Sequence, residues 1–215
     1  MSKKVKFGFI AVAIAVFLVL ITNLIHGCTE RKKVELEQQI DFLQEEFSPM
    51  AFEISKTNNS EIKFKIVFYD INGNKVGSQV LKLTGEELNF DFQVIKLSDK
   101  SFLFFPCGVY TEQIAINDAA KITDAYNDNG FPKIYNGLLE LEDEKGKKLD
   151  LASKNNITDS IKMYYAMVMD GQTEFDTDAH GVAVHDIKNV YEFKKGFVYE
   201  VICHPHTGGI EIIRK

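Results

Sequence analysis

The sequence predicts an α+β fold: a predominantly antiparallel β-sheet with one or two packed helices, preceded by a single N-terminal transmembrane helix and a short amphipathic helix. Three observations predict this fold. A stretch near the N-terminus is uncharged and mostly aliphatic. The segment that follows it has apolar residues spaced with a helical period. From Phe52 onward apolar and polar residues alternate. We divide the chain into a basic cytoplasmic tail (1–6), a transmembrane anchor (7–27), an amphipathic spacer helix (28–48) and an extracytoplasmic α+β domain (49–215).

The anchor is predicted from the apolar run Phe7 to Ile25, which follows three lysines. As a helix with a rise of about 1.5 Å per residue, the run extends roughly 28 Å, close to the thickness of a bilayer core. We expect a cytoplasmic N-terminus and a C-terminal domain on the periplasmic side or at the cell surface. The alternative is a lipoprotein anchored at Cys28, since Ile25 and Gly27 precede this cysteine as in a lipidation signal. In both cases the domain faces the same side of the membrane.

The segment after the anchor carries a stripe of apolar residues with a helical period. The stripe consists of Leu36, Ile40, Leu43 and Phe47, at spacings of four, three and four. We interpret it as a spacer helix that packs on its own domain, ended by Pro49. The alternative is a helix-pairing face in a short coiled coil with a second copy or with another protein.

The first part of the domain has the period of half-buried strands. Ile62 and Phe64, for example, are separated by Lys63, and the pattern continues to Phe68. Short polar turns such as Asp70–Asn74 join the predicted strands into an antiparallel meander. The strands are predicted at 62–68, 76–83, 88–94 and 102–105.

The second part of the domain is predicted to contain one helix and further strands. Asn117 is a suitable N-cap for a helix that runs to Tyr126 and ends before Gly130 and Pro132. The polar segment Lys154–Asp159 resembles a loop. Exposed turn residues are predicted at 142–148, and strands at 138–141, 161–169, 182–184, 197–203 and 210–213.

Composition limits the class of partner. The chain has 31 acidic and 25 basic residues and a net charge of −6, without a Lys/Arg stripe. Nucleic-acid binding requires a basic surface, so this class is excluded. With 45% hydrophobic residues, including 17 Phe, the domain has enough apolar side chain for one core. The expected partners are the membrane and either another envelope protein or a second copy of the chain.

The three cysteines cannot all pair within one chain. Cys107 and Cys203 each end an apolar, strand-like run, and we interpret both as buried free thiols. The alternative is a disulfide between them, which an oxidising compartment would permit.

The C-terminal quarter concentrates four of the five histidines. In an extended backbone His204 and His206 point to one face, as do Asp178 and His180, and converging loops would form an N/O site for zinc or another divalent transition metal. A metal would therefore use His180, His185, His204, His206 and Asp178. Because no HExxH or paired CxxC motif is present, we prefer polar loop histidines and no cofactor.

These features favour a membrane-anchored extracytoplasmic envelope protein that acts as a non-catalytic interaction or scaffold module. We assign no catalytic residue, since the sequence lacks a GxSxG elbow and other nucleophile motifs. Two alternatives remain: a metal-binding protein or metal-dependent hydrolase that uses the histidines, and a lipoprotein that binds a small ligand between its sheet and helix.

Overall fold

A computed structural model describes residues 46–58, 60–97, 101–138, 151–170 and 193–215. The chain divides into residues 1–38 and 39–215, and all described residues belong to the second unit. The predicted tail, anchor and Cys28 lie outside the described residues. Among the residues that are described, none of the helices combines the length and the apolar character needed to cross a membrane.

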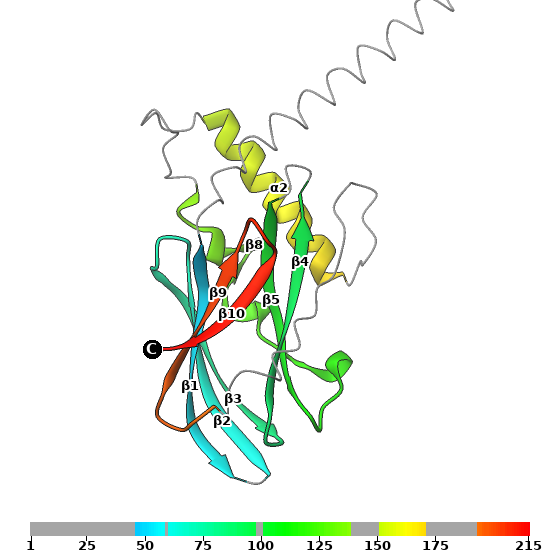
Figure 1. The fold of residues 1–215 in the computed structure, drawn as a ribbon. Coiled ribbons are helices and arrows are strands. Elements are labelled where there is room, and N and C mark those ends of the chain that lie inside the picture. The colour runs from blue at the N-terminus through cyan, green and yellow to red at the C-terminus, as the bar shows by residue number, and fades with distance from the viewer. Residues whose placement is uncertain (1–45, 59, 98–100, 139–150, 171–192) are drawn as a thin grey trace, which may run out of the picture. The chain divides into compact units, whose positions relative to one another are not determined.

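The larger sheet has five antiparallel strands in the order β10-β9-β1-β2-β3 (Figure 1). In β2 the side chains of Ile62, Phe64, Ile66 and Phe68 are buried while Lys63 and Lys65 are exposed, which confirms the predicted alternation. The strands are β1 (Phe47–Asn58), β2 (Glu61–Tyr69), β3 (Lys75–Thr84), β9 (Val198–His204) and β10 (Gly209–Arg214).

The turn between β2 and β3 confirms the predicted hairpin. The Asp70 carboxylate accepts hydrogen bonds from the backbone N–H groups of Asn72 (3.0 Å) and Asn74 (2.8 Å). Gly73 has a φ of 77°, a conformation that glycine adopts without steric cost. This short polar turn holds the two strands in register.

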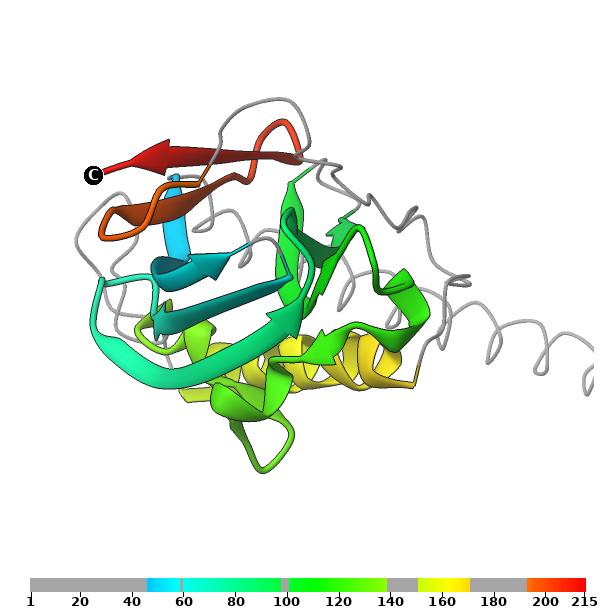
Figure 2. The same ribbon diagram turned by 90° about the horizontal axis from the view of Figure 1, so that it is seen from below.

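A second sheet consists of β4 (Leu88–Lys96), β5 (Phe102–Thr111) and β6 (Ala120–Lys121). Neighbouring residues of a strand point to opposite faces of its sheet. The Phe104 ring lies 6.3 Å from the ring of Phe47 in β1, whereas the Phe105 ring lies 5.6 Å from that of Tyr165 in helix α2 (Leu151–Met169). The second sheet therefore lies between the larger sheet and α2 (Figure 2).

The predicted spacer helix does not extend to Phe47, which is the first residue of β1 and pairs with Cys203 of β9. Its buried ring contacts the rings of Phe104 and Tyr135, and these core contacts require an extended backbone here. Pro49 lies inside β1, at a shift in register against β9. The other three residues of the predicted helix-pairing face, Leu36, Ile40 and Leu43, lie outside the described residues.

The predicted helix from Asn117 to Tyr126 is wrong, because this segment forms only short 3-10 turns and is also hydrogen-bonded to β5. The N–H of Ile122 donates to the Cys107 carbonyl (3.1 Å), and the Tyr126 hydroxyl donates to the Pro106 carbonyl (2.8 Å). From Ile116 to Tyr135 the chain forms η2 (Ile116–Asp118), β6, η3 (Thr123–Ala125), β7 (Asn127–Asp128), β8 (Phe131–Pro132) and η4 (Lys133–Tyr135).

The predicted loop at Lys154–Asp159 and strand at Ile161–Met169 are also wrong, since both belong to α2. Ile157, Ile161, Tyr165 and Val168 are buried at spacings of four, four and three, which defines one face of a helix. Leu138, predicted to begin a strand, has 3-10 geometry. The predictions for 139–148 and 182–184 lie outside the described residues, while those for the last two strands are confirmed by β9 and β10.

Candidate binding pocket

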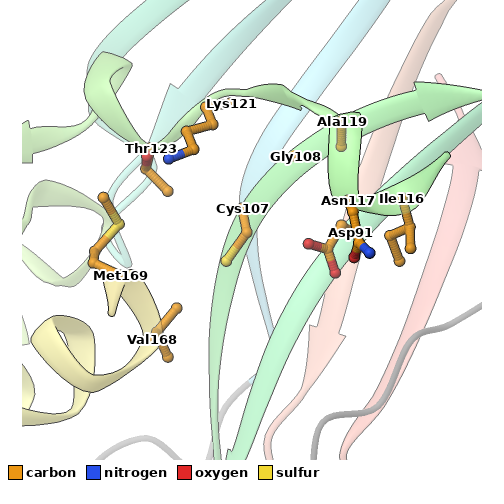
Figure 3. Close-up of a pocket in the computed structure, with 10 residues that line it drawn as sticks. All are labelled: Asp91, Cys107, Gly108, Ile116, Asn117, Ala119, Lys121, Thr123, Val168 and Met169. Atoms are coloured by element: carbon orange, nitrogen blue, oxygen red, sulfur yellow. The ribbon is translucent and has the colours of Figure 1, made fainter. Parts of the chain in front are cut away.

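A cavity of about 170 Å³ lies between the C-terminal end of α2 and the β4-β5-β6 sheet (Figure 3). Its polar lining includes Asp91 of β4, Lys121 of β6 and Thr123 of η3. Its apolar lining includes Val168 and Met169 at the end of α2. The pocket therefore combines residues from one sheet, one helix and the irregular segment that connects them.

The sheet register explains why charged side chains meet there. Asp91 pairs with Gly108, and Gly108 pairs with Lys121, so the three residues form one row across the sheet. Residues directly opposite each other in an antiparallel pair point to the same face. Gly108 has no side chain in the middle of the row, and a Cβ there would lie 2.9 Å from the Cβ of Ala119. The glycine therefore allows Ala119 to pack closely against β5 between the two charged residues.

A β-bulge adds Cys107 to the same face. The register shifts between Asp91 and Phe92, whose partners are Gly108 and Pro106, so Cys107 is the extra residue of β5. A bulge of this kind redirects a side chain that regular alternation would place elsewhere. The Cys107 thiol faces the pocket (Figure 3) and donates a hydrogen bond to the Phe105 carbonyl (3.1 Å).

Two polar atoms at the pocket lack a hydrogen-bond partner in the described part of the chain: Oδ1 of Asp91 and Oγ1 of Thr123. Both atoms are buried, which is energetically unfavourable for an unpaired oxygen. Burial raises the pKa of the Asp91 carboxyl above its ordinary value. Each oxygen would be stabilised by a donor from a bound molecule.

The Cys107 thiol is neutral at physiological pH. Burial, and secondarily the negative charge of Asp91, raises its pKa to about 12. Cys203 is fully buried in β9, and burial raises its pKa well above the ordinary value. Both thiols are free in the structure and belong to different sheets, and the alternative disulfide stays a prediction.

The predicted metal ligands are only partly described. His204 Nδ1 lies 2.8 Å from Glu46 Oε1, and Nε2 lies 3.7 Å from Glu211 Oε2. The backbone turns after His204, where the Thr207 N–H donates to its carbonyl (3.1 Å), so the predicted extended run through His206 is wrong. Within residues 46–58, 60–97, 101–138, 151–170 and 193–215, no three His, Cys, Asp or Glu side chains form a metal-binding group.

His180, His185 and Asp178 lie outside the described residues, so the metal alternative stays a prediction. Of the two described histidines, His204 already has one carboxylate beside each ring nitrogen, Glu46 at Nδ1 and Glu211 at Nε2. This arrangement is an ion-pair site when His204 is protonated.

Analysis of the sequence did not single out Asp91, Lys121 or Thr123. The available signal was the Cys107-Gly108 pair inside an otherwise bulky strand, since a glycine in a strand often marks a bulge or a close approach. No family model, curated protein or solved structure matches this chain. The chemistry of the site must therefore be inferred from its own residues.

Proposed function

We propose that the chain is a membrane-anchored extracytoplasmic envelope protein whose β-rich domain acts as a non-catalytic interaction module. The observation that carries the proposal is the uncharged run from Phe7 to Ile25, which is long enough to span a bilayer and precedes a folded domain. The three lysines before the run favour a cytoplasmic N-terminus. Lipidation at Cys28 is the alternative anchor and leaves the domain on the same side.

The free edge of β10 supports an interaction role. Among the strands that the structure describes, β10 pairs only with β9. The Lys215 N–H donates to the Val198 carbonyl of β9 (2.9 Å). Along an antiparallel strand the N–H groups point alternately toward one neighbouring strand and away from it, so those of Ile210, Ile212 and Arg214 point away from β9. Such an edge can accept an extended strand from another envelope protein.

The state of the thiols supports a non-catalytic role. A cysteine nucleophile requires a thiolate, which a lowered pKa provides. In this domain burial raises the pKa of both Cys107 and Cys203, so each thiol stays protonated at physiological pH. Neither cysteine is an activated nucleophile.

The anchor is tested on membranes from cells that produce the full chain. We expect the intact polypeptide to resist extraction at alkaline pH and the domain to be cleaved by a protease added from outside. Mass spectrometry of the N-terminus distinguishes the two anchors, because a lipoprotein would begin at an acylated Cys28. Recovery of the intact chain in the soluble cytosolic fraction would overturn the proposal.

The interaction is tested at the β10 edge. A photo-crosslinking residue in place of Ile213 should give a product with another envelope protein in intact membranes. Arg214→Pro removes an outward N–H and should abolish this product, while the matched control Arg214→Ala keeps the N–H and should retain it. A product of two copies of the chain would assign the edge to self-association, and equal products from both variants would exclude strand addition.

A second candidate function is the binding of a small ligand, and the pocket beside α2 favours it. The buried, unpaired oxygens of Asp91 and Thr123 are the specific observation, because a ligand with suitable donors would satisfy both. This function is compatible with the interaction role, since β10 and the pocket belong to different sheets.

A further inference from the structure

We propose that the pocket beside α2 binds a small zwitterion of amino-acid size, whose ammonium group contacts Asp91 and whose carboxylate contacts Lys121 and Thr123. This inference deepens the small-ligand function and rests on it. Four features of the pocket carry it: its size, its negative end, its positive end and the neutral surface between them.

The size of the cavity limits the ligand. A volume of about 170 Å³ corresponds to roughly six water molecules at their share of liquid volume. Drug-sized ligands and cofactors occupy larger pockets, typically of at least about 300 Å³. The cavity therefore fits a compact molecule with roughly six to ten non-hydrogen atoms.

Asp91 forms the negative end. Its Oδ1 atom is buried without a partner in the described part of the chain, although the residue as a whole retains some contact with solvent. A carboxylate accepts hydrogen bonds only, and an ammonium group supplies both the donors and the opposite charge. A neutral hydroxyl would satisfy Oδ1 but would leave the charge uncompensated.

Lys121 and Thr123 form the positive end. Thr123 is 2% exposed and its Oγ1 atom has no partner within the described residues, so it can donate to a carboxylate. Figure 3 shows Lys121 and Thr123 on one side of Cys107 and Asp91 on the other. Within the described residues, Asp91 and Lys121 do not form an ion pair with each other, and strand β5 lies between them.

The sheet holds the two charged ends of the pocket apart. Asp91 and Lys121 are two strands apart, so their Cα atoms are about 10 Å from each other. Figure 3 shows the Lys121 ammonium group directed toward Thr123, so these two residues together form the site for the carboxylate. The neutral thiol of Cys107 lies between the ends, and Val168 and Met169 add apolar lining for the uncharged part of the ligand.

The test measures binding to the full chain in detergent by equilibrium dialysis with three matched probes. Leucine carries both charges, 3-methylbutylamine lacks the carboxylate, and 4-methylpentanoate lacks the ammonium group. We expect leucine to bind with a dissociation constant near 1 mM, an order-of-magnitude value for so small a ligand, and each analogue to bind about tenfold more weakly. Glycine and 4-aminobutyrate, tested in parallel, vary the side chain and the separation of the charges.

Two variants assign the ends of the pocket. Asp91→Asn should weaken binding of leucine about tenfold without weakening binding of 4-methylpentanoate, and Lys121→Met should weaken leucine but not 3-methylbutylamine. Lys82→Met, at an exposed lysine on β3, should leave all affinities unchanged. Circular dichroism confirms that each variant is folded.

The possible results distinguish binding of a zwitterion from binding of another small ligand. If 3-methylbutylamine or 4-methylpentanoate binds as tightly as leucine, the pocket binds a small ligand but the zwitterion is excluded. If none of the five probes binds at about 50 mM, some fifty times the expected dissociation constant, both the zwitterion and the small-ligand function are overturned. Unchanged binding of leucine to Asp91→Asn and Lys121→Met would place the site elsewhere and would also overturn the inference.

Discussion

The hydroxyl of Tyr135 forms two hydrogen bonds with the backbone of Phe104: it accepts one from the N–H (2.8 Å) and donates one to the carbonyl (3.1 Å). Both residues are completely buried. Phe104 is in β5 and Tyr135 ends η4, so this pair fixes the irregular segment after β6 to the central strand. The Tyr126 hydroxyl also fixes this segment to β5, because it donates a hydrogen bond to the Pro106 carbonyl (2.8 Å).

Tyr135→Phe should therefore destabilise the domain without leaving a cavity. The substitution leaves the Phe104 N–H and carbonyl buried without a partner, at about 1 to 3 kcal/mol for each group. We expect the free energy of unfolding to fall by about 3 kcal/mol, measured by urea denaturation. The matched control Tyr69→Phe changes a partly exposed tyrosine of β2 and should have little effect. Equal stability of the two variants would show that the bonds to Phe104 contribute nothing.

The close approach of β3 to η3 gives a second prediction. A Cβ on Gly77 would lie 1.9 Å from the Ala125 carbonyl oxygen, and this atom belongs to the backbone. Gly77→Ala must displace η3 or β3 and should lower the free energy of unfolding by about 2 kcal/mol or more. Faster hydrogen exchange of the Tyr126 N–H, which donates to Thr123, would locate the displacement. Ser78→Ala at the next position should change neither quantity.

The pKa values of buried groups predict unfolding at alkaline pH. Burial raises the pKa of Cys107 from 9.0 to about 12 and that of Tyr165 from 10.0 to about 12. Because the pKa of each group is higher in the folded state, its contribution to the free energy of unfolding is complete below the unfolded-state pKa and is lost as pH rises through the folded-state pKa. The free energy of unfolding should therefore decrease between about pH 9 and pH 12. Cys107→Ala should reduce the part of this decrease that begins near pH 9, and the buried thiol of Cys203 should account for the remainder, as measured by urea denaturation across the range.

The strand pattern of the larger sheet could be predicted because each strand has one buried face. Burial of Phe64 and Phe68 beside exposed lysines is a local property, visible in a few residues of sequence. Helix α2 was missed because Asn155, Thr158 and Asp159 have low helix propensity. Its helical spacing is nevertheless present, from Ile157 through Ile161 and Tyr165, and tertiary packing outweighs the propensity.

The segment from Asn117 to Tyr126 shows a different limit of sequence analysis. It has good helix formers, but Ile122 and Tyr126 form hydrogen bonds to β5, which precedes the segment in the chain. Likewise the pocket depends on the bulge at Cys107 and on the register that aligns Asp91 with Lys121. These are long-range relationships, and spacing along the sequence does not encode them. The regular alternation of β4 indicated only that Asp91 points away from the Phe-rich core.

Asp91 allows the electrostatics of the pocket to be tested separately from any ligand. Burial raises the pKa of its carboxyl above 3.8 in the folded state. Because this pKa is higher in the folded state than in the unfolded state, the contribution of Asp91 to the free energy of unfolding is complete below the unfolded-state pKa and is lost as pH rises through the raised pKa. The ionised carboxylate therefore destabilises the domain at neutral pH. Burial is the cause of this shift, and the neutral Cys107 thiol and Asn117 beside Asp91 add no positive charge to compensate it.

Asp91→Asn should consequently raise the free energy of unfolding at neutral pH and change it less at about pH 4, where a larger fraction of the wild-type carboxyl is protonated. Urea denaturation at both values measures the difference, and Asp118→Asn, at an exposed residue of η2, should show no such pH dependence. A variant that is less stable than wild type at neutral pH would mean that Lys121 already compensates the Asp91 charge. The pocket would then hold a balanced internal pair, and an ammonium ligand would gain little from Asp91.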